Sequence, residues 1–89
     1  MRDEKELILK KDLRELALKT REQLHITQKE MSELLSMKEK SYSDIETGVY
    51  MCGTLTCVLL LMIQDDPRIF LNQLKVEFAK EYEKELQLI

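Results

Sequence analysis

The chain has 89 residues, of which 44% are hydrophobic and 35% are charged, and its formal net charge is −3. With two glycines and one proline, this composition indicates a single small all-helical domain over residues 1–89, not a sheet protein or a disordered tail. The mild acidity argues against a strongly basic nucleic-acid-binding surface. No apolar run approaches the roughly 18 residues of a membrane span, and the first residues lack a secretory signal. We therefore expect a cytoplasmic protein that makes no membrane contact.

Residues 4–24 carry the first helical pattern. Its apolar positions fall on one stripe at steps of three and four. They are Leu9, Leu13, Leu16, Ala17 and Leu24, and the residues expected on the wet side are Lys10, Lys11, Asp12, Arg14 and Glu15. His25 follows the last apolar position. We expect it to end the helix in a left-handed conformation, which histidine tolerates better than most residues.

Residues 26–48 read as two short helices joined by a tight turn. Thr27 and Glu30 form a capping box, which predicts the start of the first of these helices. Its apolar face is Met31, Leu34 and Leu35. The sequence Ser-Met-Lys at 36–38 interrupts the pattern.

A second short helix follows the interruption. Tyr42, Ile45 and Val49 restart the apolar spacing, and Gly48 is expected to close the helix with positive φ. Its start has two alternatives. Either it begins after Lys38, a poor cap, or Ser36 and Glu39 form an S-x-x-E cap and it begins earlier.

The segment after the next loop is almost wholly apolar. Thr54 is a candidate cap for a helix over residues 55–63, which must be covered on all sides because it has no polar face. The spacing of Cys52 and Cys57 fits neither a C-x-x-C redox pair nor a zinc finger, and one histidine supplies no convincing third ligand. We expect reduced thiols, with at least Cys57 in the core, and no metal or cofactor.

Asp66 and Pro67 predict the start of a last helix, over about residues 67–88. Its stripe, Phe70, Leu74, Phe78, Tyr82 and Leu86, is longer than a small core can cover. We therefore expect a homodimer with an isologous interface. Its expected residues are Leu59, Met62, Phe70, Leu74, Phe78 and Tyr82. The alternative is that this helix folds back over the core of its own chain.

The segment from Ile26 to Gly48 resembles the helix-turn-helix of the phage-repressor and Cro-like regulators, the XRE family. The matching residues are Ile26, Thr27, Gln28, Met31, Ser32, Met37, Tyr42, Ser43, Ile45, Glu46 and Gly48. The likeness covers about two-thirds of the chain. It implies an all-α, five-helix lambda-repressor-like DNA-binding domain with a long C-terminal helix.

The resemblance also assigns roles by position. It implies an ion pair between Arg21 and Glu46, and a small residue, Ser32, where the two helices cross. It places double-stranded DNA against Thr27, Gln28, Lys38, Glu39, Lys40, Ser41, Ser43, Asp44 and Thr47. Lys40 would donate to guanine, while Glu39 or Asp44 would accept from cytosine. Tyr42 stands where a smaller aliphatic is common, and its hydroxyl is expected to emerge at the DNA backbone.

The sequence departs from this family in charge and in the turn. Ser36 stands where a glycine is usual, and residues 26–48 carry three lysines against five acidic side chains, a net of −2. DNA affinity depends largely on phosphate neutralisation, so we expect weak binding per subunit and a dependence on dimerisation. The leading hypothesis is a homodimeric transcriptional regulator, acting as a repressor on an inverted repeat. The alternative is a protein-interaction module with a degenerate helix-turn-helix and a partner of unknown identity. No constellation indicates an enzyme.

Overall fold

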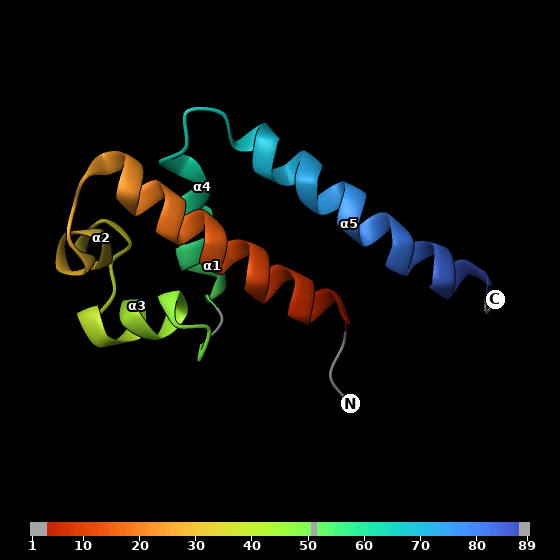
Figure 1. The fold of residues 1–89 in the computed structure, drawn as a ribbon, viewed down its shortest axis with the longest axis horizontal. Coiled ribbons are helices and arrows are strands. Elements are labelled where there is room, and N and C mark those ends of the chain that lie inside the picture. The colour runs from red at the N-terminus through yellow and green to blue at the C-terminus, as the bar shows by residue number, and fades with distance from the viewer. Residues whose placement is uncertain (1–3, 51, 88–89) are drawn as a thin grey trace.

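The described part of the chain is built from α-helices and turns. The computed structural model describes residues 4–50 and 52–87. The five helices are α1 (Glu4–Leu24), α2 (Gln28–Leu34), α3 (Glu39–Glu46), α4 (Thr54–Met62) and α5 (Pro67–Gln87). The predicted all-α class and the number of helices are confirmed. Figure 1 shows α2 and α3 gathered at one end of the molecule, away from the end of α5.

The two long helices, α1 and α5, pack in opposite directions. Near one end, Lys5 Nζ lies 2.7 Å from Glu85 Oε1. At the other, Gln64 Nε2, just before α5, donates to Thr20 Oγ1 at 2.8 Å. The contacts thus join the start of α1 to the end of α5, and Figure 1 shows the two axes running alongside each other. The molecule measures 46 × 29 × 18 Å, elongated along this pair.

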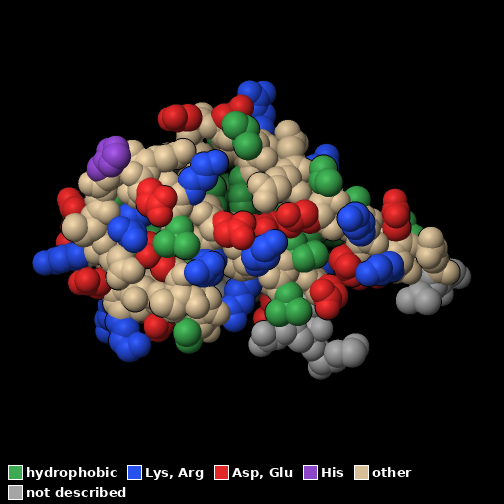
Figure 2. Space-filling model, in the orientation of Figure 1, with side chains coloured by type: hydrophobic (Ala, Val, Ile, Leu, Met, Phe, Trp, Pro, Cys, Tyr) green, Lys and Arg blue, Asp and Glu red, His purple; other side chains and the backbone are tan. Residues whose placement is uncertain are grey.

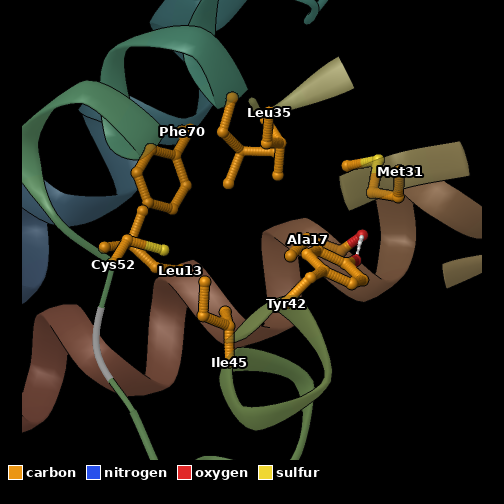
Figure 3. Close-up of a cluster of buried hydrophobic side chains, with 9 residues drawn as sticks. Leu13, Ala17, Met31, Leu35, Tyr42, Ile45, Cys52 and Phe70 are labelled. Carbon is orange, nitrogen blue, oxygen red and sulfur yellow. Dashed lines mark hydrogen bonds between the residues drawn. The ribbon is translucent and has the colours of Figure 1, made fainter. Parts of the chain in front are cut away.

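One hydrophobic core draws on all five helices. Its buried side chains are Leu13, Ala17, Met31, Leu35, Tyr42, Ile45, Cys52, Leu60 and Phe70. Figure 3 shows that Tyr42 of α3 points inward, and its hydroxyl donates to the carbonyl of Ala17 at 3.4 Å. The expectation that this hydroxyl emerges at a DNA backbone is wrong. The face of α3 that carries Tyr42 packs on α1, so the whole side chain is enclosed.

The helices α1, α2 and α3 end in the same way. Each is followed by a residue with positive φ: His25 (56°), Ser36 (55°) and Gly48 (81°). After α2, the amide of Ser36 donates to the carbonyl of Glu33 at 3.1 Å, and that of Met37 donates to Ser32 at 2.9 Å. This pair of bonds is a Schellman motif, which satisfies carbonyls that the end of a helix leaves free. The expected conformations of His25 and Gly48 are confirmed.

The starts of α2 and α5 follow the predicted caps. Thr27 Oγ1 accepts from the amide of Glu30 at 3.1 Å, and Glu30 Oε1 accepts from the amide of Thr27 at 3.0 Å, which completes the capping box. Asp66 Oδ1 accepts from the amide of Arg68 at 3.1 Å, with Pro67 in the first helical position. Both starts are decided by neighbours in the sequence.

Of the two starts left open for α3, the one after Lys38 is confirmed, whereas the predicted Thr54 cap of α4 is wrong. The N-cap of α3 is Lys38 and it makes no side-chain cap bond, so the alternative start with a Ser36 cap does not occur. Ser36 cannot serve there because it already forms the left-handed turn after α2. The N-cap of α4 is Gly53, and Thr54 is the first helical residue instead of the cap.

The stripe on α5 that was predicted to form a dimer interface is largely used within the chain. Phe70 is buried in the core, and Leu59 and Leu74 pack against it. Phe78 meets Tyr82 edge to face, at 6.4 Å between ring centroids, and Lys5 Nζ lies 4.6 Å above the Tyr82 ring. The assignment of Phe70 to an interface is therefore wrong. An antiparallel α1 of the same length can cover this stripe without the entropy loss of association.

Apolar surface remains uncovered on α4. Leu55, Val58 and Met62 are exposed along one face of this helix, Met62 at 74%, while Thr56 and Leu60 face the core. Burial of α4 on all sides is therefore not achieved within one chain. Within residues 4–50 and 52–87, no helix combines the length and the hydropathy needed to cross a bilayer.

Candidate nucleic-acid interface

The outer surface of α2 and α3, called here the α2–α3 face, carries the residues predicted to contact DNA. Five of them are exposed, namely Thr27, Lys38, Glu39, Lys40 and Thr47. The other four are partly exposed, namely Gln28, Ser41, Ser43 and Asp44. None of the nine is buried, because the inward positions of both helices are taken by core residues. No described segment of the chain covers α3 from outside.

Glu46, at the end of α3, holds three helices together. Arg21 of α1 donates from Nε to Glu46 Oε2 at 2.6 Å and from Nη2 to Oε1 at 3.1 Å. Gln28 of α2 donates from Nε2 to the same Oε1 at 2.9 Å. The ion pair expected between Arg21 and Glu46 is present. The bond from Gln28 was not anticipated, and it joins the start of α2 to the end of α3.

The protonation state of Glu46 follows from these contacts. Burial alone would raise the pKa of Glu46, but the contacts with Arg21, with the nearby Tyr42 hydroxyl and with Gln28 outweigh it and lower the pKa below its usual value. The same contact raises the pKa of Arg21. Both groups are therefore charged at neutral pH. The side chain of Glu46 is only 4% exposed, so this charge is fixed inside the protein.

Arg14 also supports the end of α3, a role that was not predicted. It was expected on the wet side of α1, yet its Nε donates to the carbonyl of Glu46 at 2.6 Å. The bond satisfies a carbonyl at the C-terminus of the helix, where positive charge is favoured. A usable signal existed in the sequence, because Arg14 precedes Arg21 by seven residues and so lies on the same face of α1.

The centre of α3 carries an ion pair of its own. Lys40 Nζ lies 3.4 Å from Asp44 Oδ2, one turn along the helix, and Lys40 is 87% exposed. Thr47 Oγ1 donates to the carbonyl of Asp44 at 3.2 Å. An exposed pair of this kind is weak, so a ligand can separate it. Until it does, the charge of Lys40 is partly compensated.

Ser32, which the resemblance places where α2 and α3 cross, is enclosed. Its side chain is buried, and its hydroxyl donates to the carbonyl of Lys29 at 2.6 Å, within its own helix. A larger side chain at this buried position would have to displace its neighbours.

Charges of both signs alternate over the α2–α3 face. Figure 2 shows basic and acidic side chains side by side at this end of the molecule, with no continuous basic patch on the face in view. In the described part of the chain, Lys29 and Lys38 take part in no ion pair. They are therefore the lysines of this face whose charge remains uncompensated.

No protein-family model, curated protein or solved structure matches this chain. Among residues 4–50 and 52–87, no three His, Cys, Asp or Glu side chains are placed to hold a metal ion together. The side chains of the α2–α3 face are hydroxyls, amides, carboxylates and ammonium groups. These are the groups that donate to and accept from phosphates and base edges.

Proposed function

We propose that this protein is a sequence-specific double-stranded DNA-binding transcriptional regulator of the phage-repressor and Cro-like type, acting as a homodimer on an inverted repeat. The observation that carries the proposal is the Glu46 contact set. Arg21, Gln28 and Arg14 all bind Glu46 and hold α2 and α3 in a fixed relation to α1. A helix that reads DNA needs such a rigid base, because its side chains must meet base edges in register.

In the proposed complex, α3 lies in the major groove. Glu39, Lys40, Ser43 and Asp44 meet the base edges, and Lys40 leaves Asp44 to donate to guanine acceptors. Asp44, released in the same step, accepts from the exocyclic amine of cytosine. The exchange replaces one exposed ion pair with two base contacts, which supports a preference for sites that hold both bases.

The phosphate contacts come from the edges of the same face. Lys38 and Thr47 flank α3 and Ser41 lies in its first turn, while Thr27 and Gln28 lie at the start of α2. One N–H of the Gln28 amide is already used on Glu46, and the second is free to bond a phosphate oxygen. Lys29, which is exposed beside Gln28, adds a cation outside the nine positions predicted to contact DNA.

The homodimer is needed because one subunit supplies few positive charges. Residues 26–48 have a net charge of −2, so two copies in successive major grooves, about 34 Å apart, are required for useful affinity. The surface proposed for self-association is the exposed face of α4. Residues 52–64 contain no charged side chain, so two copies of this face can meet across a two-fold axis without like-charge repulsion.

The experiment is selection of bound duplexes from a random library, followed by fluorescence anisotropy on the selected site at low salt. Lys40→Ala should relax sequence preference, while Lys38→Ala should weaken all sites alike and reduce the salt slope by about one. Lys75→Ala, which removes an exposed lysine from α5, is the matched control and should change neither. Absence of saturable binding by a verified dimer would exclude the proposal.

A second candidate is an interaction module that keeps the fold and binds a protein. The observations that favour it are the compensated charge of Lys40 and the net charge of the α2–α3 face. It predicts that the selection enriches no duplex sequence and that anisotropy detects no salt-dependent binding of DNA. The same experiment therefore separates the two functions.

A further inference from the structure

The two cysteines of the chain meet at the start of α4. Gly53 is the N-cap, so Cys52 directly precedes the cap and Cys57 is the fourth residue of the helix. Side chains at these two positions commonly pack against each other across the first turn of a helix. Here Cys57 Sγ lies 3.8 Å from the carbonyl oxygen of Cys52, to which it donates weakly while protonated, and the two thiols also interact with each other.

The two thiols have different surroundings. Cys52 is 7% exposed and belongs to the hydrophobic core, where Figure 3 shows it beside Leu13 and Phe70. Cys57 is only partly buried. One thiol is therefore open to a small solute, and the other is enclosed next to it. At least Cys57 was expected in the core; it packs against the core while partly buried, and Cys52 is the more deeply buried of the two.

The pKa values of the two thiols differ as well, and the more exposed thiol is the more acidic one. The hydrogen bond between the thiols lowers the pKa of Cys57 to about 7, against the opposing effect of burial. The contact with Cys57, and then burial, raise the pKa of Cys52. Near neutral pH, Cys57 is thus a thiolate in a large fraction of molecules, while Cys52 keeps its proton. A partly exposed thiolate next to a second thiol is the arrangement found in cysteines that respond to oxidants.

We propose that Cys57 is a site of oxidation by hydroperoxides and that Cys52 is its resolving thiol, so that the pair closes to an intramolecular disulfide. The Cys57 thiolate attacks one peroxide oxygen, the S–O bond forms, the O–O bond breaks, and hydroxide leaves. The Cys52 thiol then attacks the sulfenic sulfur, and the oxygen leaves as water with the proton of Cys52. Two thiols lose two electrons to one hydrogen peroxide, which becomes two water molecules once the hydroxide is protonated.

The disulfide would join the connection between α3 and α4 to the first turn of α4. This connection begins at Thr47, which belongs to the α2–α3 face. The two cysteines already flank one helix start, and the space beside Gly53, which lies between them, is open. This inference does not depend on DNA binding, and its test does not use DNA.

The test treats the reduced protein with one equivalent of hydrogen peroxide at about pH 7 and quenches it with N-ethylmaleimide. Intact mass spectrometry should show a monomer that has lost two hydrogen atoms and takes up no maleimide. Both cysteines lie in the tryptic peptide 41–68, so the same mass loss should appear in that single peptide. The native protein should react about threefold faster than the chain in denaturant, because its larger thiolate fraction outweighs the lower nucleophilicity of that thiolate.

Two variants separate the roles of the thiols. Cys52→Ala should stop at the sulfenic acid, which dimedone captures on Cys57, while Cys57→Ala should react no faster than the unfolded chain. Circular dichroism checks that each variant is folded, and the wild-type measurements stand without them. The proposal is overturned if the wild-type thiols both remain open to maleimide, if only intermolecular disulfides form, or if Cys57→Ala reacts as fast as the wild type.

Discussion

The guanidinium of Arg21 binds both carboxylate oxygens of Glu46, from a helix that lies 25 positions earlier in the chain. The glutamate is nearly inaccessible to water, whereas Arg21 is 24% exposed on its side chain. The free-energy cost of losing one partner therefore differs between the two residues. A lone arginine here can reach water, but a lone glutamate cannot.

Removal of Arg21 is accordingly expected to be severe. Arg21→Met should lower the free energy of unfolding by about 3–5 kcal/mol, because the charge of Glu46 stays buried without a cation. The double variant Arg21→Met/Glu46→Gln should recover much of this loss, and urea unfolding followed by circular dichroism measures both. A double variant less stable than Arg21→Met would contradict this account.

The contribution of Glu46 to stability also depends on pH. Because folding lowers the pKa of Glu46, this contribution is present above the pKa of the unfolded chain and is lost as the pH falls through the folded pKa.

Ser36 adopts a backbone conformation that glycine accepts more easily. Its φ of 55° places a side chain in the left-handed region, as at His25. Ser36→Gly should raise the free energy of unfolding by about 0.5–1 kcal/mol, since the relief of strain exceeds the entropy cost of glycine. The converse variant is Gly48→Ala, whose new Cβ would lie 3.6 Å from Arg14 Cδ, an ordinary contact. It should lose about 1 kcal/mol from backbone strain alone. Equal effects of Ser36→Gly and Ser36→Ala would refute the explanation.

Asp12 should make the fold less stable at alkaline pH. It was expected in water, yet it is 1% exposed, and neither carboxylate oxygen has a hydrogen-bond partner among the described residues. Burial, and then the neighbouring carboxyl of Glu77, raise the pKa of Asp12 to about 7. Lys11 lowers this pKa and Glu15 raises it, both less strongly. Because the folded pKa lies above the unfolded one, the stability is present at low pH and is lost as the pH rises through about 7.

The free energy of unfolding should be lower at about pH 8 than at about pH 5.5, by about 1–2 kcal/mol from this group. Asp12→Asn should remove this difference and be the more stable protein at the higher pH. Glu77→Gln is the companion variant, which should weaken the pH dependence without abolishing it. Urea unfolding at the two pH values measures all three proteins. An Asp12→Asn variant that keeps the wild-type pH profile would assign the effect elsewhere.

Asp44 is expected to limit DNA affinity through its contact with Lys40. Asp44→Asn removes one negative charge and frees the ammonium group, so non-specific affinity at low salt should rise by about threefold to tenfold. The plot of log K against log salt should steepen by about one unit. Asp65→Asn is the control, because it makes the same charge change at an exposed position before α5. If the two variants behaved alike in anisotropy titrations, net charge alone would explain the gain.

Self-association is expected to depend on the exposed face of α4. Met62→Glu should dissociate the proposed dimer, because a two-fold axis brings two like charges into an apolar contact. Val76→Glu makes the same kind of change at an exposed apolar residue of α5 and should leave the mass unchanged. Sedimentation equilibrium reports both. A wild-type chain that stays monomeric at high concentration would remove the dimer from the proposed function.

Much of the local structure could be predicted because its causes lie within a few residues. The capping box of Thr27 and Glu30, the Asp66–Pro67 helix start and the turns at His25 and Gly48 involve partners at most five positions apart. Lys40 and Asp44 are also close in the sequence, one helical turn apart, so their ion pair could have been anticipated from this spacing. The outward positions of α3 were predicted from helical period, which separates them from the core positions, and none of them is buried: Glu39, Lys40, Ser43, Asp44 and Thr47.

What only the tertiary structure decided is which helix covers which face. Phe70 lies in the core of its own chain because α5 turns back along α1, and Tyr42 is enclosed because α3 packs on that same helix. The packing of α5 along α1 also buries Asp12, and the packing of α3 on α1 brings Arg14 to Glu46. A stripe of apolar residues specifies that a helix face must be covered. It does not specify whether another helix of the same chain or a second copy of the chain covers it, because both require the same sequence pattern. The choice between them depends on distances between segments more than 20 residues apart, which hydrophobic periodicity along the chain does not contain.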